Sequence, residues 1–191
     1  SDLDAIGGVM SFYTLTPQTA LEDAPFVKGM GALRYASANE ELSGHFDVNV
    51  GWEKWAFLTS FSHNRYGDLR MGRYGPDDYL RPEFVRRIDG EDRVVTNEDP
   101  LVQRPSGYSQ TNLMQKLRFR PDERWDFTYA FHYSTTTDYD RYDRLLRYRD
   151  NRPRSAEWRY GPQVWMMNNL RVRHQGRGGF YDELILNLAH Q

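Results

Sequence analysis

The sequence predicts an all-β protein, an antiparallel up-and-down transmembrane β-barrel segment of about seven strands from a larger barrel. Three observations predict this fold. Aromatic residues alternate with small or polar ones, the connections alternate between short and long, and 15% aromatic content coexists with a mean hydropathy of -0.82. In a membrane barrel only every second residue faces lipid, so a polar average and an apolar face occur together. No run of 18 apolar residues exists, so no transmembrane helix is expected.

The clearest alternation is WDFTYAFHY, Trp125 to Tyr133, with an aromatic residue at every odd position. Side chains alternate between the two faces of a strand, so the five rings are predicted to share one face. A second protein layer could cover that face in a soluble sandwich. Rings at both ends of a strand about ten residues long also suit a bilayer, where aromatic residues gather at the two interfaces.

Similar alternation predicts the other strands of the sheet, and no helix is predicted. The seven expected strands are residues 28–38, 45–52, 55–63, 110–120, 125–134, 164–173 and 180–190. Most of these strands have only one apolar face, as expected of a sheet with different surroundings on its two sides.

The alternation also predicts which side chains face lipid and which face the barrel lumen. The lipid-facing set is Phe46, Val48, Val50, Trp55, Phe57, Leu117, Trp125, Phe127, Tyr129, Phe131, Tyr133, Leu184, Leu186 and Leu188. The lumenal set is Asp47, Asn49, Lys116, Arg118, Thr128 and His132.

The connections provide a second regularity. Two are long, residues 64–109 and 135–163, and they are predicted to be outer loops without secondary structure of their own. The connections after the second, fourth and sixth strands are short, and in a meander these three fall at the opposite end of the sheet from the long loops. Outer-membrane barrels have this asymmetry of short turns and long extracellular loops. The connection 39–41 is short although it falls at the long-loop end.

Several segments resemble one protein family. The segment DAIGGVMSFYT, Asp4 to Thr14, resembles the end of the plug domain of TonB-dependent outer-membrane receptors, where Gly7-Gly8 leads into an extended run. Four further segments resemble the first barrel strands and outer loops of these receptors, particularly those of Bacteroidetes. These segments are YASANEE (35–41), DLRMG (68–72), RYDRL (141–145) and AEWRYGPQVW (156–165).

The resemblance implies that residues 1–24 end a plug and lead to the barrel, and that residues 25–191 form the N-terminal part of the barrel. Members of the family lie in the cell outer membrane of Gram-negative bacteria. They bind and actively import a scarce nutrient complex of the iron-siderophore, heme or cobalamin type. The expected partners are outer-membrane lipid, that nutrient complex and the remaining barrel and plug of the parent chain.

A further expected partner is TonB, reached through an N-terminal segment that this sequence lacks. Seven strands are also far fewer than the roughly 22 of a complete outer-membrane transporter. This segment alone is therefore not expected to transport.

A secreted or periplasmic β-sandwich that binds glycan or peptide is the alternative. In it, aromatic faces would meet across a core and the long loops would form the binding site. A formal charge of -2 gives no reason to expect nucleic acid as a partner. The chain has no cysteine, no GxSxG motif and no glycine-rich phosphate loop, so an enzyme is not expected.

The loop sequence DYDRYDRLLRYRDNRPR, residues 138–154, alternates acidic residues, tyrosine and arginine. Arginine can bind carboxylates or phosphates through two parallel hydrogen bonds, and tyrosine adds contact area. The candidate ligand-binding residues are Arg141, Tyr142, Arg144, Arg147 and Tyr148. The same side chains could instead pair with the neighbouring aspartates and hold the loop in shape, so both interpretations stay open.

No resident cofactor is predicted. Acidic clusters in the first long loop, Asp77-Asp78, Asp89 with Glu91-Asp92, and Glu98-Asp99, offer oxygen ligands for a possible calcium ion, but arginines interrupt them and no EF-hand spacing occurs. The five histidines lack zinc-site spacing. By phase, His45 and His132 should face the lumen, where heme ligation in the parent receptor is the functional alternative to a solvated polar group.

Overall fold

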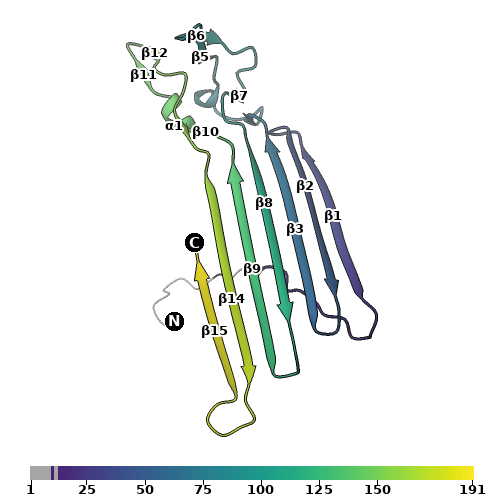
Figure 1. Cartoon of the computed structure of the whole chain (residues 1–191). Helices are drawn as coiled ribbons and strands as arrows, with labels where there is room; N and C mark the ends of the chain where they lie inside the picture. The colour runs from purple at the N-terminus through teal and green to yellow at the C-terminus, as the bar shows by residue number, and fades with distance from the viewer. Residues whose placement is uncertain (1–9, 11–12) are drawn as a thin grey trace.

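The computed structural model describes residue 10 and residues 13–191. Seven long antiparallel strands form one sheet in the order β1-β2-β3-β8-β9-β14-β15, so each strand lies beside its neighbour in the meander (Figure 1). Their bounds are β1 Phe26–Ala36, β2 Glu41–Gly51, β3 Trp55–Tyr66, β8 Tyr108–Phe119, β9 Trp125–Thr136, β14 Val164–Gln175 and β15 Glu183–His190. The all-β prediction and the seven-stranded antiparallel sheet are confirmed. The sheet is open, with β1 and β15 at its edges.

Three strand boundaries differ from those predicted by three or four residues, and one of them is the end of β3 at Tyr66 rather than residue 63. β2 begins at Glu41 rather than residue 45 because Gly44, which interrupts the side-chain alternation, is still paired with Leu33 in the ladder. β15 begins at Glu183 rather than residue 180. Before it, Gly178 and Gly179 have φ angles of 84° and 103°, a left-handed backbone that favours glycine and extends the turn.

The ladder register places all fourteen predicted lipid-facing residues on one face. One row across the sheet pairs Val50 with Phe57, Phe57 with Leu117 and Leu117 with Tyr129. Aromatic rings stack across strands, with the Trp55 and Phe119 ring centroids 4.1 Å apart. Cross-strand aromatic pairs of this kind stabilise a sheet.

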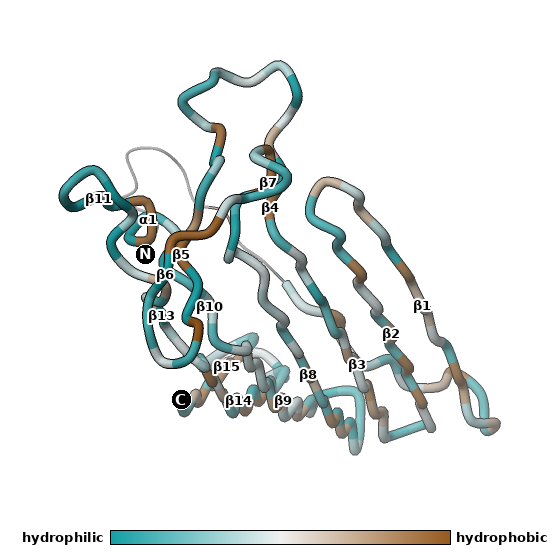
Figure 2. Tube along the Cα trace, turned by 90° about the horizontal axis from the view of Figure 1, so that it is seen from above, coloured by the Kyte–Doolittle hydropathy of each residue, from teal (hydrophilic) through white to brown (hydrophobic). Residues whose placement is uncertain are grey.

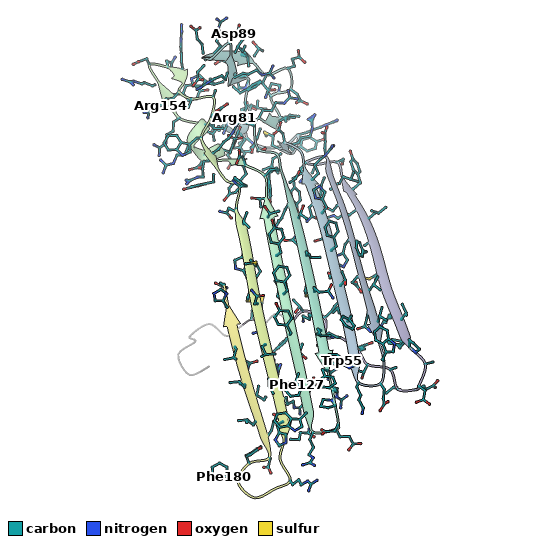
Figure 3. The ribbon with its side chains drawn as sticks, viewed as in Figure 1. Trp55, Arg81, Asp89, Phe127, Arg154 and Phe180 are labelled. Carbon is teal, nitrogen blue, oxygen red and sulfur yellow. The ribbon has the colours of Figure 1, made fainter. Side chains whose placement is uncertain are left out.

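This apolar face is exposed. Phe57 and Tyr129 are each 41% exposed and Leu186 is 48% exposed, although all three lie within strands of the seven-stranded sheet. The described residues place no second layer over it, and the sheet follows a curve when it is seen from above (Figure 2). Figure 3 shows Trp55 and Phe127 near the short-turn end.

The six predicted lumenal residues lie on the opposite face, in register with one another. Asn49 is opposite Leu58, Leu58 is opposite Lys116, and Arg118 is opposite Thr128. Asp47, Asn49 and Lys116 are buried. This polar face is therefore the one that other parts of the chain cover.

The prediction that the long loops lack secondary structure is wrong. Residues 67–107 form two small two-stranded ladders, and so do residues 137–163. The elements are β4 Leu69–Arg70 with β7 Val102–Gln103, β5 Glu83–Ile88 with β6 Glu91–Thr96, β10 Tyr139–Asp140 with β13 Arg159–Tyr160, and β11 Tyr148–Arg149 with β12 Arg152–Pro153.

The loops also contain a 3-10 turn, Asp77–Tyr79, and a one-turn helix α1, Tyr142–Leu145, where no helix was predicted. Strands of two residues are too short to produce a visible alternation. In the described part of the chain, no helix is long and apolar enough to cross a membrane.

Candidate functional sites: the polar face and the loop cap

A segment near the N-terminus lies on the polar face of the sheet. The Lys116 Nζ donates hydrogen bonds to Thr14 Oγ1 at 2.7 Å and to the Leu15 carbonyl at 2.6 Å. Lys116 is only 8% exposed. A buried ammonium group needs such partners, because an unpaired one would lose its hydration without compensation.

The adjacent part of the segment is bound through both backbone hydrogen-bonding groups of Gln18, as a residue in a strand is bound by its neighbour. The Asn49 side chain accepts a hydrogen bond from Gln18 N at 2.8 Å and donates one to the Gln18 carbonyl at 2.9 Å. Arg118 donates to the Pro17 carbonyl at 2.9 Å, and its guanidinium group also pairs with Asp126.

The approach is close where the segment passes the end of β2. A Cβ atom at Gly51 would lie 2.2 Å from the Gln18 carbonyl oxygen, so this position requires glycine. Pro17 is fully buried, and the Ala20 amide donates to the Trp52 carbonyl at 3.0 Å. Three predicted lumenal residues, Asn49, Lys116 and Arg118, therefore bind the chain itself.

Above this segment the polar face carries a recess of about 520 Å³. Apolar side chains such as Leu15, Met30 and Trp165 line it together with hydroxyl and amide groups, and the Ser134 hydroxyl donates to Asn112 Oδ1 at 2.7 Å. His45 and His132 both border the recess, as their phase in the strands predicts. His45 Nε2 lies 3.4 Å from Asp47 Oδ2, whereas the His132 ring lies near Trp165, with the two centroids 6.3 Å apart. The recess thus offers polar groups that could contact a polar ligand or another protein segment.

The other three histidines do not join this recess. His63 contacts the Thr111 hydroxyl at 2.9 Å, and His174 contacts the Tyr181 hydroxyl at 2.7 Å. His190 is opposite Asn168 in the ladder, on the face that carries the aromatic rings.

The two long loops pack against each other at the opposite end of the sheet from the short turns, and Figures 1 and 2 place α1 near β5. Val85 from one loop and Leu145 and Ala156 from the other are buried around a small shared cavity. The Ala156 amide donates to Asp92 Oδ2 at 3.2 Å, which joins the loops directly. We call this unit, residues 67–107 and 137–163, the loop cap.

Four of the five candidate ligand-binding residues take part in contacts within the loop cap. Arg141 donates two 2.7 Å hydrogen bonds to Asp143, and its guanidinium carbon lies 5.3 Å from the Tyr160 ring centroid. Arg144 lies over the Trp158 ring at 5.7 Å, and Tyr142 borders the inter-loop cavity. The sequence pattern left open whether the RYDRL motif binds a ligand or holds the loop in shape. In the structure its side chains make contacts within the loop.

The electrostatics of the loop cap follow from these contacts. Hydrogen bonding from Arg141 holds the pKa of Asp143 below its ordinary value, and the same bond raises the pKa of Arg141. Burial raises the pKa of the Tyr142 hydroxyl. The Tyr148 side chain is exposed but also borders the inter-loop cavity, whereas Arg147 is exposed beside the β11–β12 hairpin.

Three of the seven carboxylates in the acidic clusters of the first loop, Glu91, Asp92 and Asp99, pair with arginine. Asp99 pairs with Arg70, and Asp92 accepts a 2.7 Å hydrogen bond from Arg87, which lowers the pKa of Asp92. Within residues 10 and 13–191, no three acidic or histidine side chains gather at a distance suited to a metal ion. The structure therefore gives no support to the possible calcium site.

The segment that resembles the end of a plug, Asp4 to Thr14, lies mostly outside the described residues, and its Gly7-Gly8 turn is among those not described. What sequence reasoning missed is the docking of residues 14–20. The only feature of the sequence that indicates this docking is the set of polar side chains at alternate positions of β2 and β8. No protein-family model, curated protein or solved structure matches this chain.

Proposed function

We propose that this chain is the N-terminal barrel part of a TonB-dependent outer-membrane receptor, which binds and imports a scarce nutrient complex in a Gram-negative bacterium. The observation that carries the proposal is the contrast between the two faces of one sheet. The ring-bearing face is exposed, and the polar face holds the chain segment that leads into β1.

The exposed face is larger than a water-soluble monomer ordinarily tolerates. Exposed aromatic and aliphatic side chains follow one another across six of the strands, whereas soluble monomers rarely show contiguous apolar patches of more than a few hundred Å². Acyl chains would cover these side chains. The polar groups on the same face include Thr59, which donates a hydrogen bond to Gln115, and Asn168, which accepts one from Tyr129, so these groups are paired within the sheet. The exposed rings near the strand ends, such as Trp55 and Trp125, suit the interfacial aromatic belt of a membrane sheet.

The open edges support the same proposal. β1 and β15 each have a neighbour on only one side, and unpaired backbone groups are costly in lipid. Further strands of a parent barrel would pair with both edges. The segment at residues 14–20 lies where the end of a plug would cross the lumenal face before the barrel begins.

Nutrient import and coupling to TonB rest on the sequence resemblance alone. The experiment that tests them deletes the gene encoding this chain and measures uptake of labelled iron chelates, heme and cobalamin under limiting supply. The proposal predicts that uptake of one of these falls and that the intact gene restores it, in a manner that requires TonB. Unchanged uptake of all three classes would contradict it.

A matched pair of variants connects uptake to the membrane face. Tyr129→Arg puts a charge near mid-strand on the exposed face and should cost about 2 to 4 kcal/mol in a bilayer, so assembly and uptake should fall. Ser60→Arg puts the same side chain on the polar face, opposite Asp47 in the ladder. Because Ser60 borders the recess, this variant is the control for assembly alone, which should be unchanged. If instead the chain is soluble and monomeric without detergent and melts cooperatively, the β-sandwich alternative is favoured.

A further inference from the structure

The β11–β12 hairpin at the tip of the second long loop carries four arginines on one face. Arg149 is directly opposite Arg152, and the Arg154 amide donates to the Arg147 carbonyl at 2.9 Å, which continues the same ladder. Residues opposite each other, and residues two apart, share a face of a hairpin. Arg147, Arg149, Arg152 and Arg154 therefore project from the same side.

These arginines are poorly compensated by the protein. All four are exposed, and the Arg149 side chain is 76% exposed. The nearest carboxylate is Asp150, at 4.0 Å from Arg149, and within the described part of the chain no carboxylate lies within 4 Å of the Arg147, Arg152 or Arg154 guanidinium groups. Like charges directly opposite each other destabilise a ladder, so this arrangement costs stability.

The neighbouring hairpin shows how such a cost is ordinarily offset. Arg86 and Arg93 are also opposite each other in the β5–β6 ladder. There, however, the Arg86 guanidinium lies over the Phe84 ring at 5.4 Å, and Arg93 pairs with Glu91 at 3.2 Å. The β11–β12 arginines have no equivalent partners among the described residues.

The hairpin is held in place from its other face. Tyr148 and Pro153, which alternate with the arginines, border the cavity shared by the two loops. The arginine face is therefore directed away from the rest of the loop cap, and Figure 3 shows Arg154 at the outer margin of the cap. The turn itself consists of Asp150 and Asn151, both with positive φ, as a tight two-residue hairpin turn requires.

We propose that this arginine face binds a soluble anion that carries several phosphate groups. Guanidinium groups bind phosphate oxygens through paired hydrogen bonds, and two opposed arginines could share one phosphate while the next pair binds a neighbouring phosphate. A bound anion also removes the repulsion between the opposed guanidinium groups. The inference does not depend on what covers the aromatic face of the sheet.

The test uses the chain refolded in a nonionic detergent and titrated calorimetrically with tripolyphosphate. Binding should occur and should weaken as salt rises. Arg149→Gln combined with Arg152→Gln should weaken it roughly tenfold or more, since hydrogen bonds to charged groups contribute about 1.5 to 3 kcal/mol. Arg86→Gln combined with Arg93→Gln removes the same charge from the neighbouring hairpin and should change the affinity less than about twofold.

Three results would overturn the proposal. These results are an absence of tripolyphosphate binding, equal weakening of binding by the two double variants, and binding to micelles containing phosphatidic acid without binding to tripolyphosphate. The second result would indicate net charge rather than a site, and the third would indicate a lipid headgroup. Circular dichroism and tryptic fragment patterns check that each variant retains its fold, which substitutions at exposed positions should preserve.

Discussion

At the residue scale, Asn49 and Lys116 perform one task from two different strands. Both point to the polar face, and both replace the water that the backbone of the segment at residues 14–20 would otherwise bind. Asn49 does so with a neutral amide and Lys116 with an ammonium group. Because hydrogen bonds to charged groups contribute more than neutral ones, Lys116 should be the stronger anchor.

Lys116→Met should release the beginning of this segment. Two hydrogen bonds to the ammonium group are lost, each contributing about 1.5 to 3 kcal/mol, so local opening becomes more frequent. Chymotrypsin cleavage after Tyr13 and Leu15 should accelerate several-fold, as measured by mass spectrometry over time. Lys54→Met, in an exposed turn, is the matched control and should leave cleavage unchanged. Equal cleavage rates in the two variants would show that Lys116 does not anchor the segment.

The short turn between β8 and β9 depends on the charge of one aspartate. Asp122 Oδ1 accepts hydrogen bonds from the Arg124 backbone amide at 2.8 Å and from the Trp125 backbone amide at 3.0 Å. These backbone hydrogen bonds favour the carboxylate and hold the pKa of Asp122 below its ordinary value of 3.8. A lowered pKa contributes stability at pH values above 3.8, and this contribution is lost as pH falls through the folded-state pKa.

Hydrogen exchange checks this prediction. Protection factors of the Arg124 and Trp125 amides, corrected for intrinsic exchange, should fall as pH drops below 3.8. Asp122→Asn keeps an acceptor but cannot titrate, so its protection should be independent of pH in this range. Asp122→Ala should lose protection at every pH. A pH-dependent step that persists in the asparagine variant would assign the titration to another group.

At the element scale, the two long loops pack together as one folded unit rather than as independent loops. Val85 in β5 and Leu145 at the end of α1 line the same cavity. Asp92 in β6 accepts a hydrogen bond from the Ala156 amide. Loosening one loop should therefore loosen the other. This coupling matters for the arginine face, because the β11–β12 hairpin borders the same cavity.

Leu145→Ala tests the coupling of the two loops. Truncation of a buried leucine typically costs about 2 to 5 kcal/mol, and here the loss should fall on the loop cap while the sheet stays intact. Tryptic cleavage should accelerate in both residues 67–107 and residues 137–163, with an unchanged β-sheet circular dichroism signal. Leu69→Ala, at an exposed position of β4, is the control. Faster cleavage confined to residues 137–163 would mean that the loops fold independently.

The elements also show what the sequence could and could not predict. Strict alternation, as in Trp125 to Tyr133, predicts both a strand and its faces, because the side-chain period of a strand is two. In contrast, β11 and β12 contain two residues each, and such strands leave no periodic signal. The docking of Gln18 on Asn49 depends on contacts between residues 31 positions apart, which local patterns do not encode.

At the scale of the whole molecule, the two faces of the sheet meet different surroundings. The polar face is partly covered by the chain and carries a recess, whereas the ring-bearing face is covered by nothing that the described residues provide. Alternation identified the two faces, but it could not identify the medium beside the rings, because lipid and a second protein layer favour the same side chains. The proposed function requires that lipid acyl chains cover the ring-bearing face.

Collision measurements on nitroxide spin labels test that claim most directly. Labels are placed singly at Phe57, Tyr129 and Leu186 on the ring-bearing face and at Ser60 and Asn187 on the other face, with the chain refolded into phosphatidylcholine vesicles. The first three should collide frequently with oxygen, which concentrates in the bilayer, and rarely with a water-soluble nickel chelate. The last two should show lower oxygen accessibility. Labels at Phe57, Tyr129 and Leu186 that are shielded from both reagents, or that collide freely with the nickel chelate, would contradict the account.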